Sequence, residues 1–181
     1  ITTKGGSSDR LIGFQEMIEE TWARIEKLSE KDGGMRGTPS GFKDLDNKLS
    51  GFQKSDLIIL AARPSVGKTS LALDFARNAA VKHGVPVAVF SLEMSKEQLV
   101  DRMLSAQSQV DGWKLRTSRF SLDEEYERLQ QGMHELMKAP IYVDDKAANT
   151  VLNMRSVLRR LNSDKPIGLI IVDYLQLMGT A

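Results

Sequence analysis

The chain has 181 residues, and its 25 Lys and Arg against 24 Asp and Glu give a formal net charge of +1. With 41% apolar and 27% charged residues, this is the composition of an ordinary globular domain, which excludes a disordered tail, a fibrous repeat and a strongly charged polymer-binding protein. The absence of cysteine and the presence of only two histidines exclude a disulfide framework and a Cys-rich zinc site.

No stretch approaches the roughly 18 consecutive apolar residues that a membrane span requires, so we expect a soluble, cytoplasmic protein. The polar, Gly/Ser-rich residues 1–12 predict a flexible linker or the remnant of a cut inside a longer chain.

Residues 11–30 carry the pattern of an amphipathic helix. The apolar residues recur at steps of three and four, namely Phe14, Ile18, Trp22, Ile25 and Leu28. Gly33 and Gly34 separate this helix from the rest of the chain. Its apolar face could therefore pack either on the chain's own core or on a neighbouring molecule, and the pattern leaves both open.

Four short apolar runs further along the chain predict strands that are covered on both faces: 57–62, 85–90, 140–143 and 167–175. Helical patterns lie between them. One helix runs from Gly67 to about residue 83, and capping boxes at 95–98 and 121–124 open two more. Thr150 starts the last helix. Its pattern places Val151, Met154, Leu158 and Leu161 inward and Arg155 and Arg159 outward. Alternating strands and helices predict an α/β fold with a mostly parallel sheet and helices on both faces.

The segment ARPSVGKT, residues 62–69, matches the phosphate-loop pattern G-x-x-x-x-G-K-[ST] except at its first glycine. Backbone N–H groups of such a loop surround phosphate oxygens at the start of a helix. Lys68 supplies a positive charge for the β- and γ-phosphates, and the hydroxyl of Thr69 a ligand for Mg²⁺. We therefore expect ATP and Mg²⁺ to bind here, through Ala62, Arg63, Pro64, Ser65, Val66, Gly67, Lys68, Thr69 and Ser70. The competing interpretation is a chance Gly-Lys-Thr at a helix start.

Two carboxylates complete the expected site. Asp173 ends an apolar run, as does a Walker B aspartate that holds Mg²⁺ through water. Glu93 follows the run at 85–90 and is the candidate for orienting or deprotonating the attacking water, since ligands lie beyond the carboxyl ends of parallel strands. A solvated loop carboxylate is the alternative for Glu93. We interpret Asp144 and Asp145 as turn and cap residues.

Several blocks together resemble the replicative DNA helicases of the DnaB family: TPSGF at 38–42, Leu-Asp at 45–46, SGF at 50–52, AARPSVGKT at 61–69, FSLEMS at 90–95 and VDYLQL at 172–177. The resemblance covers about residues 13–178, and the family's loop commonly begins with Ala. It implies a RecA-like P-loop NTPase domain at 35–181 and, at 13–31, a linker helix that docks on the adjacent subunit of a homohexameric ring.

Residue by residue, the resemblance implies that Glu93 is the catalytic base, that Lys68 contacts phosphate and that Thr69 and Asp173 hold Mg²⁺. It places Arg102 near the γ-phosphate; a surface arginine beside Asp101 is the alternative. Single-stranded DNA, a primase and a helicase loader are the implied partners, in the bacterial cytoplasm or nucleoid.

Such motors continue into a further sheet strand with a sensor glutamine, DNA-contacting loops and basic residues that enter the neighbour's ATP site. The resemblance places that strand between the Walker B and phosphate-loop strands, so a chain ending at 181 would leave a central gap. We therefore expect a fragment that does not unwind DNA alone.

Two other functions remain open from the sequence. Another RecA-like ATPase, of the recombination-accessory or clock type, would share the phosphate loop but should lack the linked blocks at 38–46 and 90–95. A non-catalytic fragment would bind nucleotide, or a partner through the stripe at 14–28. Trp113 with Lys114, Arg116 and Arg119 could contact a single strand, although a solvated connection between helices is the simpler interpretation.

Overall fold

The computed structural model describes residues 13–29, 35–119 and 123–179. The predicted linker at 1–12 and the start of the predicted capping box at 121–124 lie outside this part. The chain divides into two compact units, 1–34 and 35–181. In the ranges that the structure describes, no helix is long and apolar enough to cross a membrane.

Helix α1 (Phe14–Ser29) is the element described in the first unit. Its predicted apolar stripe is exposed: the exposed fractions of Phe14, Ile18, Trp22 and Ile25 are 76, 53, 62 and 48%. The side chain of Leu28 lies outside the described part. Within its own unit, α1 therefore carries an exposed apolar face.

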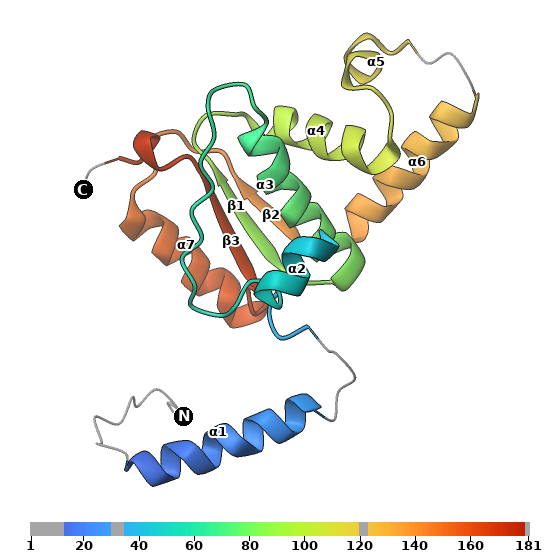
Figure 1. The fold of residues 1–181 in the computed structure, drawn as a ribbon. Coiled ribbons are helices and arrows are strands. Elements are labelled where there is room, and N and C mark those ends of the chain that lie inside the picture. Colours follow the sequence, from blue (N-terminus) through green and yellow to red (C-terminus); the bar gives the residue numbers. More distant parts are fainter. Residues whose placement is uncertain (1–12, 30–34, 120–122, 180–181) are drawn as a thin grey trace. The chain divides into compact units, whose positions relative to one another are not determined.

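The second unit is built on three parallel strands in the order β2-β1-β3 (Figure 1). These are β1 (Val87–Ser91), β2 (Ile141–Asp144) and β3 (Leu169–Asp173). In register, Val87 of β1 lies opposite Ile141 and Leu169, and Ser91 lies opposite Asp173. The helices are α2 (Lys43–Leu49), α3 (Lys68–Arg77), α4 (Lys96–Ser108), α5 (Gly112–Thr117), α6 (Asp123–Lys138) and α7 (Val151–Asp164), with a π-helical turn η1 (Asn78–Lys82) and a 3-10 turn η2 (Leu175–Leu177).

Alternate residues of β1 face two apolar clusters. Val87 and Val89 share one cluster with α3 and α4, whose contributing residues are Leu73, Ala76, Leu99 and Met103. Ala88 and Phe90 share the other with Met154 and Leu158 of α7. Because every residue of β1 is buried, the sheet is covered on both faces by helices, as the apolar runs predict.

The predicted strand at 57–62 is not a strand in this structure. Its backbone is not paired with any described strand, and Leu57 and Ile59 are 86 and 75% exposed. A strand is stabilised by ladder hydrogen bonds to a neighbour, and this run forms none with the described strands. The apolar pattern shows that the side chains suit a covered strand, but it does not show whether a neighbouring strand is present to pair with it.

A second expectation fails at the start of α7. Val151 is 62% exposed rather than inward, whereas Met154 is buried and Leu158 packs on the core. Val151 is the first residue after the N-cap Thr150, whose hydroxyl accepts from the N–H of Asn153 at 3.3 Å. The start of the helix is thus set by its cap, and the Val151 side chain in the first turn stays exposed.

The segment that precedes the phosphate loop is fastened to α3. Thr38 and Phe52 form an antiparallel bridge, and the ring of Phe52 packs on Phe75 of α3 with centroids 5.2 Å apart. Gly41 has φ +83°, and a Cβ there would come within 2.3 Å of the Asn78 side chain. Glycine is therefore required at 41 both by its backbone conformation and by the close approach of α3.

Candidate active site

The phosphate loop leads directly into α3. Gly67 is the N-cap residue of the helix and has φ +101°. A Cβ at Gly67 would meet nothing within 4 Å, so the backbone angle rather than space selects glycine. The first N–H groups of a helix have no partner inside the helix and carry partial positive charge. The loop thus ends at a site suited to an anion. Ala62, which replaces the first glycine of the pattern, does not have a positive φ, so its backbone conformation is open to a residue with a Cβ.

Lys68, Thr69 and Asp173 come together although Asp173 is distant in the sequence. The ammonium of Lys68 lies 3.0 Å from Oδ1 of Asp173, and the hydroxyl of Thr69 donates to Oδ2 at 2.5 Å. Asp173 ends β3 and is buried, with 7% of its surface exposed. The phosphate-loop lysine, the predicted Mg²⁺ ligand and the Walker B carboxylate thus form one cluster.

Tyr174 also belongs to this cluster, and sequence reasoning missed it. The Lys68 Nζ lies 4.1 Å from the centroid of the Tyr174 ring, a cation–π contact. The signal available beforehand was an aromatic residue directly after the Walker B aspartate.

The end of β1 brings Glu93 to the same edge of the sheet. Ser91 lies opposite Asp173, and the N–H of Leu92 donates to the Asp173 carbonyl at 2.7 Å. Glu93 follows immediately and is exposed. It therefore lies at the carboxyl edge that holds Asp173, with access to water, as a base that acts on a water molecule requires.

Arg102 of α4 contacts the first turn of α3, directly after the phosphate loop. Its Nη1 donates to the Ser70 hydroxyl at 3.2 Å. Ser70 is one residue past Thr69, so the guanidinium is held close to the loop while staying exposed.

The donor set suits Mg²⁺. This cation prefers oxygen ligands and is held through one or two carboxylates together with substrate phosphates and water. The Thr69 hydroxyl and the Asp173 carboxylate supply such oxygens, whereas no group of three or more His, Cys, Asp or Glu that could form a protein-only metal site occurs in the described ranges.

The remaining predicted residues have local partners. Asp145 accepts from the Lys96 N–H at 3.0 Å and Asp144 from that of Lys146 at 3.0 Å, in agreement with cap and turn roles. Lys114 pairs with Glu125 at 2.5 Å, and the guanidinium of Arg119 lies 5.9 Å from the Trp113 ring. The basic residues near Trp113 are thus largely engaged within the helical connection.

Comparison with known families assigns the chain. The family described as the DnaB-like helicase C terminal domain matches residues 37–181. The chain belongs to this family. Because the match covers most of the chain, the DnaB-like assignment rests on the whole α/β unit and not on the phosphate loop alone.

Curated relatives are replicative helicases. The chain is 46% identical over 165 residues to the replicative DNA helicase DnaB of Geobacillus stearothermophilus, covering 91% of this chain and 36% of that protein. It is 48% identical over 170 residues to the DnaB of a Nostoc species, covering 92% of this chain and 19% of that protein. The DnaB-like chain therefore spans about a third or less of these relatives.

Solved structures confirm the fold. One solved ATPase domain superposes with a TM-score of 0.85 at 29% identity, covering 95% of this chain and 60% of that one. A DnaB-like replicative helicase, solved in a study of its interactions with primase, gives 0.82 at 30% identity, covering 97% and 42%. The DnaB-like chain thus has the predicted RecA-like α/β fold of a P-loop NTPase.

Proposed function

We propose that this chain is part of the motor of a replicative DNA helicase, which hydrolyses ATP with Mg²⁺ at subunit interfaces, moves along single-stranded DNA and unwinds the duplex. The observation that carries the proposal is the convergence of Lys68, Thr69 and Asp173 in a DnaB-like chain. These are a phosphate-binding cation and two oxygen ligands at one helix start.

Each residue has a defined task in this proposal. The N–H groups at the start of α3 and the Lys68 ammonium bind the β- and γ-phosphates and reduce their charge. Thr69 and Asp173 would hold Mg²⁺, which when bound would offset the negative charge that develops on the phosphates. Arg102 keeps its Nη1 bond to the Ser70 hydroxyl and offers its other N–H groups to an oxygen of the γ-phosphoryl group.

The proton of the attacking water needs an acceptor. Glu93 takes it as the water oxygen bonds to the γ-phosphorus, and the bond from that phosphorus to the β–γ bridging oxygen breaks. ADP and inorganic phosphate leave. The exposed position of Glu93 at the carboxyl edge gives the water access to it.

We further propose that the chain assembles with copies of itself as a hexameric ring through the predicted linker helix of residues 13–31, which the structure describes as α1 over Phe14–Ser29. The exposed stripe of Phe14, Ile18, Trp22 and Ile25 supports this, because such a stripe gains stability when another surface covers it. A primase and a helicase loader complete the proposed partners. The solved relative that was studied with primase supports the first of these.

ATP turnover by the complete protein that carries this chain tests the catalytic proposal. Glu93→Gln keeps the side-chain volume but removes the proton acceptor, so kcat should fall by about 10²-fold or more. The dissociation constant for Mg-ATP should stay within about threefold, since Glu93 acts on water rather than on the phosphates. Glu127→Gln, an equal change on the exposed face of α6, should leave both constants unaltered. Full turnover by Glu93→Gln would contradict the role of this residue, and nucleotide binding without turnover by the unmodified protein would favour a binding module.

A further inference from the structure

We propose that Arg77 is a positioning residue for ATP hydrolysis, because it sets the distance between helices α3 and α4, which carry the two halves of the site. The inference rests on the proposed function and extends it to a residue far along α3 from the phosphate loop. Arg77 is the last residue of α3, nine positions after Lys68.

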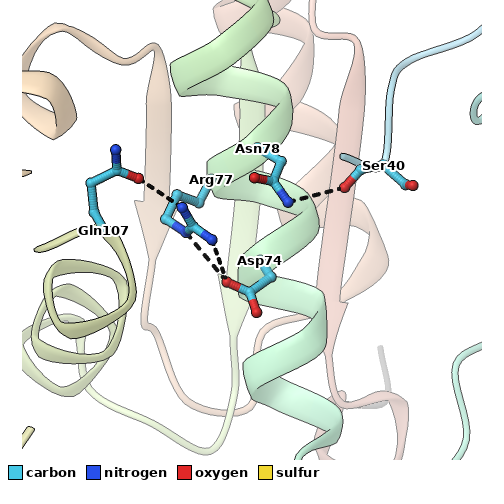
Figure 2. Close-up of polar contacts among 5 residues, drawn as sticks. All are labelled: Ser40, Asp74, Arg77, Asn78 and Gln107. Carbon is cyan, nitrogen blue, oxygen red and sulfur yellow. Dashed lines mark hydrogen bonds and ion pairs between the residues drawn. The ribbon is translucent and has the colours of Figure 1, made fainter. Parts of the chain in front are cut away.

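Arg77 is held in one orientation by two helices (Figure 2). Its Nη2 and Nε donate to Oδ1 of Asp74, one turn earlier on α3, at 2.9 and 3.3 Å. Its Nη1 donates to Oε1 of Gln107 on α4 at 2.8 Å. The Arg77 side chain is only 16% exposed, so solvent screens these bonds less than it would screen a surface pair.

Gln107 is itself fixed from the other side. Its Nε2 donates to the carboxylate of Glu135 on α6, which also accepts from Gln131 at 3.0 Å. The Gln107 side chain, which accepts from Arg77, is therefore held in place by α6 as well as by its own helix α4. The chain of bonds runs from α3 through α4 to α6.

The seam between α3 and α4 is bridged at two levels. Arg102 donates to Ser70 at the end near the phosphate loop, and Arg77 donates to Gln107 at the far end. A pocket of about 370 Å³ lies between α3, α4 and α5, and both bridges line it in part through Ser70, Arg77 and Arg102. The apolar side chains of Leu73 and Met103 belong to the core cluster and also line this pocket. The two polar bridges add directed bonds across the same seam.

This spacing matters for the chemistry. Lys68 and Thr69 begin α3, whereas Glu93 lies just before the Ser95 cap of α4 and Arg102 lies on α4. A helix moves approximately as a rigid body. A tilt of α3 against α4 therefore displaces the side chains at the start of α3 relative to those of Glu93 and Arg102. A misplacement of about 1 Å costs on the order of 10²-fold in rate.

Helix α3 is also held on its other side, by the segment at 38–52. A shift of α3 would therefore change its position relative to α4. The side-chain amide of Asn78 donates to the Ser40 carbonyl at 3.3 Å, and Asn78 is buried (Figure 2). The segment at 38–52 also packs on Phe75. Removing the Arg77 bridge therefore leaves α3 tied to that segment, while the far end of α3 loses its polar bond to α4.

The test compares Arg77→Met, Gln107→Met and the double variant in the complete protein that carries this chain, with Arg159→Met as the matched control on the exposed face of α7. Each single variant should lower kcat by roughly 10-fold, less than the limit above because the Arg102 bridge remains. The dissociation constant for Mg-ADP should change by less than about twofold, since the phosphate loop itself is intact.

The double variant should be no slower than the slower single variant, because the two residues make one bridge. Arg77→Lys, which retains a donor and the charge, should recover part of the lost rate.

A purely structural role makes different predictions. It would lower the melting temperature while leaving kcat of the folded protein unchanged at 20 °C or below, and that result would overturn the inference, as would additive losses in the double variant. If the unmodified protein binds Mg-ADP but does not turn over ATP, the proposed function fails instead. The two failures are thus distinguished by the unmodified protein.

Discussion

At the scale of single residues, the end of the Arg77 network makes a prediction about pH. Hydrogen bonds from Gln131, and then from Gln107, favour the charged form of Glu135 and lower the pKa of its carboxyl group. Because the pKa is lower in the folded than in the unfolded state, Glu135 stabilises the fold above the ordinary glutamate pKa. This contribution is lost as the pH falls through the lowered value.

An NMR titration of the Glu135 side chain checks this direction. Gln131→Leu removes the larger cause, so it should raise the pKa of Glu135 toward its ordinary value. Gln130→Leu, the same change one residue earlier on the exposed surface of α6, should leave it where it is. An equal pKa in all three proteins would contradict the role of the Gln131 bond.

How far the sequence predicts the site also differs from residue to residue. Lys68, Thr69 and Asp173 could be predicted to meet, because one motif starts a helix and the other ends a strand of the same sheet edge. The ring of Tyr174 over Lys68 and the bond from Arg77 to Gln107 could not. Their partners are fixed by the packing of separate elements, and the spacing of residues along the chain carries no information about that.

At the scale of elements, the run at 57–62 makes a second prediction. Within the described part, none of its backbone N–H groups donates to a backbone carbonyl, whereas β1 is paired on both sides. In the chain of 181 residues, amides 57–62 should therefore exchange with solvent deuterium at rates near those of an unfolded peptide, while amides 87–91 stay protected. Hydrogen exchange read by mass spectrometry measures both segments in one sample. Comparable protection of the two would contradict an unpaired run.

The same run shows why an apolar pattern predicts some strands and not others. The runs at 85–90, 140–143 and 167–175 became β1, β2 and β3, whose registers are mutually supported. The run at 57–62 has similar apolar residues. A strand also needs a hydrogen-bonding neighbour, and a short stretch of sequence does not show whether one is present. Helix starts were better predicted, as at Ser95, because both halves of a capping box lie within four residues.

At the scale of the whole molecule, α1 belongs to a compact unit that is separate from residues 35–181. The sequence leaves open which surface covers its stripe, and within this unit the side chains of Phe14, Ile18, Trp22 and Ile25 are exposed. The acidic residues Glu16, Glu19, Glu20 and Glu26 keep the rest of the helix polar. The apolar and the acidic residues therefore lie on different faces of α1.

Self-association tests that proposal with a matched pair of substitutions. Ile18→Glu places a charge in the stripe, and Ala23→Glu adds the same charge on the opposite face of α1, about 140° away around the helix axis.

Fully burying an isoleucine contributes about 1.5–3 kcal/mol, and each 1.4 kcal/mol is tenfold in affinity. The dissociation constant of the assembly, measured by sedimentation velocity on the complete protein, should therefore rise by at least about tenfold for Ile18→Glu. It should remain within about twofold for Ala23→Glu, because an exposed substitution away from the contact changes little. Equal weakening by both variants would mean that the added charge, and not the apolar face, governs assembly, and α1 would then not be the docking helix.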